Sequence, residues 1–125
     1  MCGIVGLFLK DRSLEPRLGE LLTQMLVTMT DRGPDSAGIA IYSDAKPGHA
    51  RVTVQSANAD RDFATLEADL GAALGVPVTV SVKDTHAVIS VPEAQAGAVR
   101  GVLGEMRPDV RVMSERDSTE IYKEV

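Results

Sequence analysis

The sequence is poor in the residues on which nucleic-acid binding depends. Its 125 residues include no tryptophan, two tyrosines and two phenylalanines, so few aromatic rings are present on which bases could stack. The 18 acidic and 13 basic side chains give a formal net charge of -5, and this charge repels phosphate. We therefore expect no nucleic-acid partner.

Cysteine and long apolar runs are scarce as well. Cys2 is the single cysteine, which excludes a disulfide within the chain. Residues 1–13 lack the basic segment and the cleavage site of a secretory signal, and no apolar stretch approaches the roughly 20 residues that span a bilayer. These absences favour a cytoplasmic protein with no membrane partner.

The usual signatures of phosphate, dinucleotide and metal sites are also missing. There is no P-loop, no G-x-G-x-x-G motif and no pair of cysteines or histidines at metal-binding spacing. His49 and His86 are isolated, and we expect each to form local hydrogen bonds, because a metal site needs several convergent ligands. No metal or cofactor is expected.

What remains is the composition of an ordinary globular protein, and the order of the strands and helices expected below indicates an α+β fold. Apolar residues make up 44% and charged residues 25%, and the length suits one domain or two very small ones. Proline, glycine and polar residues cluster at 43–48, which marks the expected internal boundary. We expect an N-terminal segment at 1–45 and a second module at 46–125.

The N-terminal segment has the pattern strand, helix, loop, strand. Residues 3–9 form a nearly continuous apolar run, typical of a strand that is covered on both faces. Apolar residues then recur at helical spacing over 18–29. A turn cluster at 31–36 precedes 38–42, which the pattern indicates is a second buried strand.

The second module has the pattern βαββαβ over residues 50–114. The expected elements are a strand around Val52 and Val54, a helix with Phe63, Leu66, Leu70 and Leu74 on one stripe, strands at 76–82 and 86–91, a helix between Pro92 and Pro108, and a strand at Val110 and Val112. This order predicts a ferredoxin-like arrangement, in which two helices cover one face of an antiparallel sheet.

Cys2 is the strongest candidate for chemistry. Met1 is expected to be removed when a small residue follows, and the new chain end would then carry a thiol and a free α-amino group on one residue. An α-amine titrates near 7.7–8.0 and a thiol near 8.5, so the amine can accept the thiol proton near neutral pH. The alternative is that Cys2 serves as a small hydrophobic residue, as free cysteines usually do.

Arg32 is the second candidate. Its guanidinium lies at a helix end before Gly33 and Pro34, where it could bind a substrate carboxylate with two hydrogen bonds. An arginine in the last turn of a helix is equally expected from the helix dipole. Neither Cys2 nor Arg32 decides the function when taken singly.

Taken together, the two motifs resemble the start of the class II, N-terminal-nucleophile (Ntn) glutamine amidotransferases. The resemblance rests on residues 2–6 (Cys-Gly-Ile-Val-Gly) and residues 32–39 (Arg-Gly-Pro-Asp-Ser-Ala-Gly-Ile), separated by the expected helix. Residues 29–42 are most similar to the glutamate-synthase-like amidotransferase subunits of N-methylglutamate synthases. The resemblance implies that residues 1–45 begin the αββα fold of an Ntn hydrolase.

The resemblance also implies a reaction and a pocket. Cys2 would attack the side-chain amide of glutamine and release ammonia for a partner synthase in a hetero-oligomer. Arg32 matches the family arginine that shapes the glutamine pocket. Gly33, Asp35 and Ser36 match the adjoining loop, which is expected to contribute to substrate binding.

Three further family motifs have no counterpart in the sequence. They are a His-Thr-Arg type of segment for the substrate carboxylate, an Asn-Gly pair for the oxyanion hole, and a later aspartate for the substrate amine. Asn58 is the one asparagine, and Ala59 follows it. We therefore expect either a longer amidotransferase, in which 46–125 is an insertion, or a relic without turnover, and we favour the longer enzyme.

Two non-catalytic interpretations remain open at this point. In one, the βαββαβ unit makes the protein a regulatory or small-ligand-binding module, an analogy that rests on fold alone. In the other, the amidotransferase-like segment is only a scaffold within a complex. Substitution of Cys2 separates both from the enzyme.

Overall fold

The computed structural model describes residues 2–116 and 119–124. The chain divides into two compact units, Met1–Ala37 with Lys123–Val125 and Gly38–Tyr122. Among the described residues, no helix combines the length and apolarity that crossing a bilayer requires.

The first unit is built on one amphipathic helix. A 3₁₀ turn at Arg12–Arg17 leads into helix α1 at Leu18–Val27, and a second 3₁₀ turn follows at Thr30–Arg32. The predicted apolar stripe is confirmed, since its members are all half-buried: Leu18, Leu21, Leu22, Met25, Leu26 and Met29. The regular α-helix ends two residues earlier than the periodicity predicts.

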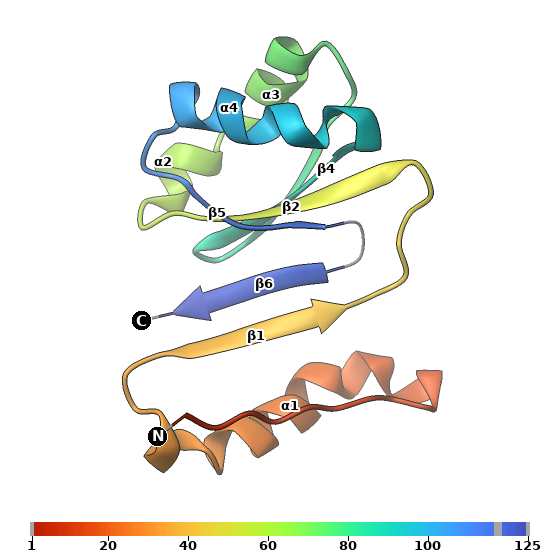
Figure 1. The fold of residues 1–125 in the computed structure, drawn as a ribbon, viewed down its shortest axis with the longest axis vertical. Coiled ribbons are helices and arrows are strands. Elements are labelled where there is room, and N and C mark those ends of the chain that lie inside the picture. The colour runs from red at the N-terminus through yellow and green to blue at the C-terminus, as the bar shows by residue number, and fades with distance from the viewer. Residues whose placement is uncertain (1, 117–118, 125) are drawn as a thin grey trace. The chain divides into compact units, whose positions relative to one another are not determined.

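The predicted strand at 3–9 is wrong in its pairing and its burial. These residues run extended beside α1 (Figure 1), but they join no sheet in the described part of the chain. Val5 and Leu7 are half-buried, whereas Ile4 is 94% and Phe8 is 85% exposed. The alternation of a strand is therefore present, but a single helix covers only one of its two faces.

The second unit contains a four-stranded antiparallel sheet. Its elements are β2 (His49–Gln55), α2 (Ala59–Phe63), α3 (Leu66–Leu74), β3 (Thr79–Lys83), β4 (His86–Pro92), a 3₁₀ turn (Glu93–Gln95), α4 (Ala96–Met106) and β5 (Arg111–Arg116). The strands lie in the order β3-β4-β2-β5, with Val52 and Val80 both opposite Ile89. The elements follow the sequence-predicted order, with the first helix divided into α2 and α3.

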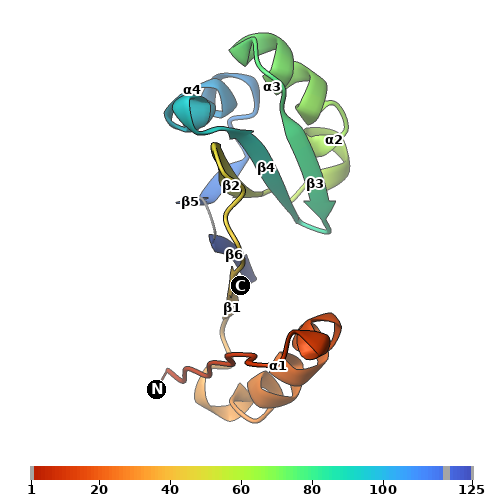
Figure 2. The same cartoon turned by 90° about the vertical axis from the view of Figure 1, so that its right-hand side faces the viewer.

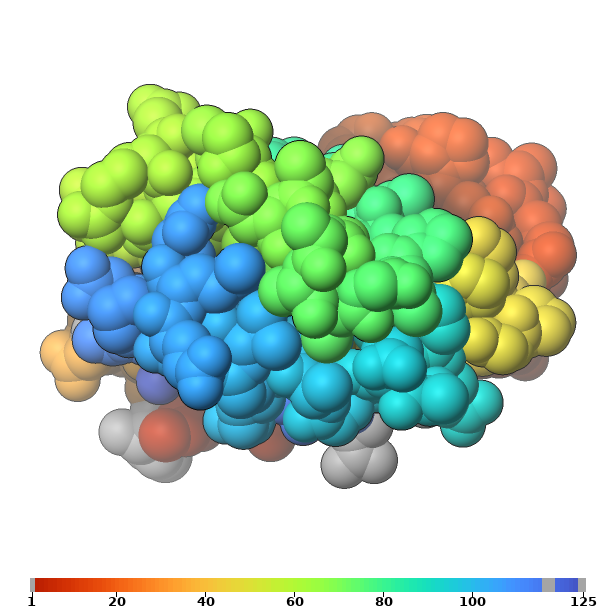
Figure 3. Space-filling model, turned by 90° about the horizontal axis from the view of Figure 1, so that it is seen from above, coloured from red at the N-terminus to blue at the C-terminus, as the bar shows by residue number. Residues whose placement is uncertain are grey.

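The core of the second unit lies between the sheet and its helices. Figures 1 and 2 show α2, α3 and α4 on one face of the sheet, and in Figure 3 they form a continuous surface over it. The buried side chains at this layer include Val52, Val54, Leu66, Leu70, Ile89, Val99 and Leu103. Helix α3 ends at Gly75, whose φ of +67° a residue with a side chain rarely adopts.

The remaining two strands form a separate two-stranded sheet. They are β1 (Ala37–Tyr42) and β6 (Thr119–Glu124), which run antiparallel in Figure 1. The strand predicted at 38–42 exists, but it is not buried, and the Tyr42 side chain is 77% exposed. The sequence interpretation missed β6.

Side chains of β6 contact the face of the large sheet that the helices leave uncovered. The Tyr122 ring lies 5.3 Å from the His86 ring, centre to centre, and the Tyr122 hydroxyl donates to Glu120 over 2.7 Å. Burial, together with the adjacent Glu120 carboxylate, raises the pKa of Tyr122 above its ordinary value. Glu120 also pairs with Arg51 of β2 at 3.4 Å.

Candidate functional site

Cys2 lies at the start of the extended N-terminal segment. Its thiol is free and exposed, so it is accessible to a reactant. The segment that carries it is held by alternate apolar side chains, Val5 and Leu7, which lie against α1. Cys2 is thus presented from an ordered stretch of chain that is fixed on one side.

Gly3 brings the cysteine segment against Arg32. A Cβ at Gly3 would overlap the terminal methyl group of Met29 and would lie 3.6 Å from Cδ of Arg32. The 3₁₀ turn explains this convergence, since its period of three residues places Met29 and Arg32 on the same side. Arg32 N–H donates to the Met29 carbonyl over 2.9 Å and closes the turn.

This contact gives Gly3 a packing role. A glycine beside a nucleophile can leave space for a substrate to approach the backbone. The structure places Met29 and Arg32 in that space. Sequence patterns alone gave no signal for Met29, whose position in the apolar stripe indicates only packing.

The other predicted pocket residues follow Arg32 in an irregular loop. Gly33, Asp35 and Ser36 lie between the 3₁₀ turn and β1, and all are exposed. The Gly33 N–H donates to the Thr30 carbonyl over 3.3 Å. Arg32 is therefore the predicted pocket residue whose packing against the Cys2–Gly3 segment the structure shows.

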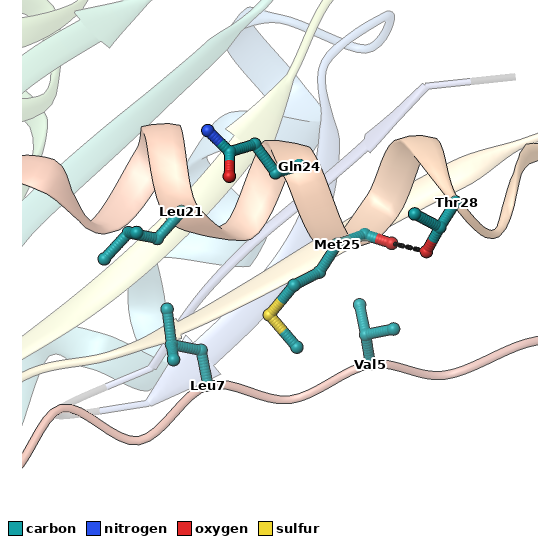
Figure 4. A pocket seen from close by; sticks show the side chains of 6 residues that line it. All are labelled: Val5, Leu7, Leu21, Gln24, Met25 and Thr28. Carbon is teal, nitrogen blue, oxygen red and sulfur yellow. Dashed lines mark hydrogen bonds between the residues drawn. The ribbon is translucent and has the colours of Figure 1, made fainter.

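An open apolar groove lies along the same unit, between the N-terminal segment and α1. Figure 4 shows its lining, and its volume is about 440 Å³. The lining residues are Val5, Leu7, Leu21, Gln24, Met25 and Thr28. The Thr28 hydroxyl donates to the Met25 carbonyl over 2.7 Å. Cys2 and Arg32 are not part of the lining, so this groove is separate from the candidate reactive groups.

The second unit contains a cluster of charged residues that has a structural role. Asp62 is 3% exposed and accepts hydrogen bonds from Ser56 over 2.5 Å and from Arg61 over 2.8 Å. These hydrogen bonds, from Arg61 first, lower the pKa of Asp62. Arg61 also pairs with Asp109 at 3.0 Å. Because these charged groups pair with one another, the cluster joins α2 to the α4–β5 loop. Its role is therefore structural.

The two histidines form local hydrogen bonds, as the sequence predicts. His49 Nδ1 lies 3.2 Å from the Pro47 carbonyl oxygen, and His86 Nδ1 lies 3.0 Å from the Thr85 hydroxyl. In the described part of the chain, no group of three or more potential ligands could hold a metal ion.

The backbone of Asn58 caps the start of helix α2. Its carbonyl oxygen accepts the backbone N–H groups of Arg61 and Asp62 at the start of α2. It belongs to the second unit, whereas Cys2 and Arg32 belong to the first. The role that the structure shows for Asn58 is therefore this backbone cap.

Comparison with known families places the chain among the glutamine amidotransferases. The model of the glutamine amidotransferase domain matches residues 1–67, which is more than half of the chain and includes Cys2 and Arg32. The chain belongs to this family.

Two curated relatives agree with this assignment. The glutamine amidotransferase-like protein GlxB of Rhizobium meliloti (strain 1021) is 63% identical over all 125 residues of this chain. A putative glutamine amidotransferase of Methanothermobacter thermautotrophicus is 52% identical over 42 residues, 34% of the chain and 13% of that relative. The chain spans 41% of the length of the Rhizobium protein. No solved structure matches the chain significantly.

Proposed function

We propose that this chain carries the nucleophile of a class II, N-terminal-nucleophile glutamine amidotransferase. The observation that carries the proposal is the packing of Gly3 against Arg32, which sets the backbone beside Cys2 next to the matching arginine of the family. The family assignment supports glutamine as the substrate. Gly33, Asp35 and Ser36 extend the proposed substrate contacts from the loop after Arg32.

The proposed reaction uses the chain end as its own base. After removal of Met1, the α-amine of Cys2 accepts the thiol proton, directly or through water, and the sulfur attacks the side-chain amide carbon of glutamine. The tetrahedral intermediate collapses with transfer of a proton to the leaving nitrogen, and ammonia departs. The γ-glutamyl thioester is then hydrolysed by water to glutamate, which restores the thiol.

A complete glutamine pocket requires groups in addition to Cys2 and Arg32. An oxyanion-hole donor contributes about 10²- to 10³-fold in rate, and the described residues near Cys2 offer no asparagine for this purpose. We propose that sequence corresponding to the remainder of the longer relative, of which this chain spans 41%, provides the oxyanion hole and the contact to the substrate amine. The ammonia would pass to a synthase partner, as the resemblance to N-methylglutamate synthase subunits implies.

The proposed architecture has two parts, an Ntn-type segment at 1–45 and an inserted or accessory module at 46–125. The strand order β3-β4-β2-β5, with helices on one face, supports a ferredoxin-like arrangement for the module. Residues 3–9 are extended and leave Ile4 and Phe8 exposed, which supports the interpretation that the N-terminal segment is part of a larger sheet.

Labelling of Cys2 by a diazoketone analogue of glutamine tests this proposal. The 125-residue chain and a chain extended to the length of the Rhizobium relative are each analysed by intact mass and peptide mapping. We expect loss of Met1 and one adduct on Cys2 in the extended chain, with protection by glutamine. In the 125-residue chain, where Cys2 is the single cysteine, iodoacetamide reports the exposure of Cys2 independently.

An Arg32→Ala variant supplies the specificity control. Loss of charged hydrogen bonds to the substrate carboxylate should slow diazoketone labelling by about tenfold to hundredfold, while iodoacetamide labelling stays unchanged. Retention of Met1, or absence of glutamine-protected labelling in the extended chain, would contradict the proposal. If Cys2→Ala left glutamine hydrolysis by the assembled protein unchanged, the alternative of a regulatory or small-ligand-binding βαββαβ module would replace it.

A further inference from the structure

Met29 joins three parts of the first unit. Its backbone N–H donates to the Leu26 carbonyl over 2.9 Å, which ties it to the end of α1. Its carbonyl accepts the Arg32 N–H over 2.9 Å, which ties it to the 3₁₀ turn. Its terminal methyl group lies where a Cβ of Gly3 would lie. One residue therefore connects the neighbour of Cys2 to Arg32.

The two threonines beside Met29 fix its backbone to α1. The Thr28 hydroxyl donates to the Met25 carbonyl over 2.7 Å, and the Thr30 hydroxyl donates to the Val27 carbonyl over 2.9 Å. Carbonyl groups in the last turn of a helix lack a partner within the helix, so these hydroxyls satisfy them. The Met29 side chain thus starts from a fixed point at the end of α1.

The Met29 side chain is better suited to spacing than to anchoring. It is half-buried, and methionine is a flexible side chain that fills irregular gaps. Its removal should therefore cost little stability but leave a space beside Gly3. Cys2 adjoins Gly3 and would move with it into that space. A displacement of about 1 Å at a reacting group can lower a rate by about 10²-fold.

We propose that Met29 is a positioning residue, which sets the placement of the Cys2 sulfur relative to the Arg32 guanidinium. The inference rests on the proposed function, in which one glutamine molecule is bound by Arg32 and attacked by Cys2. The separation of these two groups must then match the distance between the carboxylate and the side-chain amide of that molecule. Met29 acts through its contact with Gly3 rather than on the substrate.

Diazoketone labelling of Cys2 over a series of reagent concentrations tests this role, in the chain extended to the length of the Rhizobium relative. The concentration that gives half the maximal rate reports binding, and the maximal rate reports the reaction of bound reagent. Met29→Ala should lower the maximal rate by about tenfold to hundredfold and leave the half-saturating concentration unchanged, because Arg32 is retained. Arg32→Ala should instead raise the half-saturating concentration.

Two variants separate positioning from general packing. Met25→Ala is the matched control, because it removes the same side chain one turn earlier in the stripe of α1, where Met25 lines the groove with Val5 and Leu7. It should label as the wild type does. Met29→Leu keeps most of the apolar volume, so it should retain more of the maximal rate than Met29→Ala. Circular dichroism verifies that each variant is folded.

The outcomes distinguish this proposal from the proposed function. If the wild type is labelled with protection by glutamine and Met29→Ala reaches the same maximal rate, the positioning role is overturned and the proposed function stands. An equal loss of rate in Met25→Ala would also overturn it, because the effect would then be one of general packing. Absence of glutamine-protected labelling in the wild type would overturn the proposed function and the positioning role together.

Discussion

The two units of the molecule divide packing and chemistry between them. All the side chains that the structure describes as buried lie between Ala50 and Ser114, in the second unit. The first unit contains Cys2 and Arg32, yet neither α1 nor its flanking turns contain a buried residue. The family match also begins in the first unit, at residue 1. The residues with the clearest chemical signal are thus held by the weakest packing.

This difference has a thermodynamic consequence. Helix α1 has ten residues, and isolated helices shorter than about 12–15 residues are marginal in water. Its stripe is only half-buried, so tertiary contacts add less than they do for α3 and α4. We expect the first unit to open more readily than the second.

The largest predicted effect contrasts one buried and one exposed apolar side chain. Leu70→Ala should lower the free energy of unfolding of the second unit by about 2–5 kcal/mol, because Leu70 is completely buried between helix and sheet. Phe8→Ala removes a larger side chain but should change stability by no more than about 0.5 kcal/mol, because Phe8 is 85% exposed.

Hydrogen exchange with peptide resolution measures both changes, since it reports the units separately. The Leu70 variant should accelerate exchange in β2, β4 and α3 and leave α1 unchanged. If the two substitutions lowered the free energy of unfolding by similar amounts, the Phe8 side chain would be buried in solution. The two units would then not differ in packing.

The second prediction concerns the packing of Gly3 against Met29. Gly3→Ala introduces a methyl group where the Met29 methyl group lies. Because that group ends a flexible, half-buried side chain that can turn aside, the packing of residues 2–9 should be destabilised by no more than about 1 kcal/mol. Hydrogen exchange of residues 2–9 and α1 measures this change. Met29→Ala in the same chain should restore most of the lost protection, because it vacates the space.

Gly6→Ala is the matched control, since a Cβ there would meet no atom within 4 Å. If Gly3→Ala were as harmless as Gly6→Ala, the Met29 side chain would move aside without cost, and its contact with Gly3 would not hold the cysteine segment in place.

The second unit is the part that the sequence predicted best. Alternating valines and helical stripes determine its elements, because the apolar face of each pattern meets its partner within the same 85-residue unit, Gly38–Tyr122. Val52 and Ile89 lie opposite each other as neighbouring strands require. Local periodicity therefore sufficed where the packing partners are close in sequence.

The first unit and β6 were predicted less well for the same reason. The apolar run at 3–9 indicates a strand, but a strand needs a partner, and none adjoins it among the described residues. Strand β6 pairs with β1, which is distant in sequence, and Tyr122 of β6 contacts His86. No local pattern in the sequence indicates either contact. Cys2 and Arg32 stood out by motif, whereas the role of Met29 at Gly3 required the three-dimensional structure.

The last predictions concern two glycines of the second unit, whose substitution should have effects of opposite sign. Gly101→Ala should stabilise α4 by about 0.5–1 kcal/mol, because a Cβ there meets open space and alanine loses less conformational entropy in a helix. Gly75→Ala should destabilise by about 1–2 kcal/mol, because its φ of +67° lies in the left-handed region. Urea unfolding of each variant, followed by circular dichroism, measures both changes. A destabilising Gly101→Ala would mean that α4 packs against a surface in solution that this chain does not itself provide.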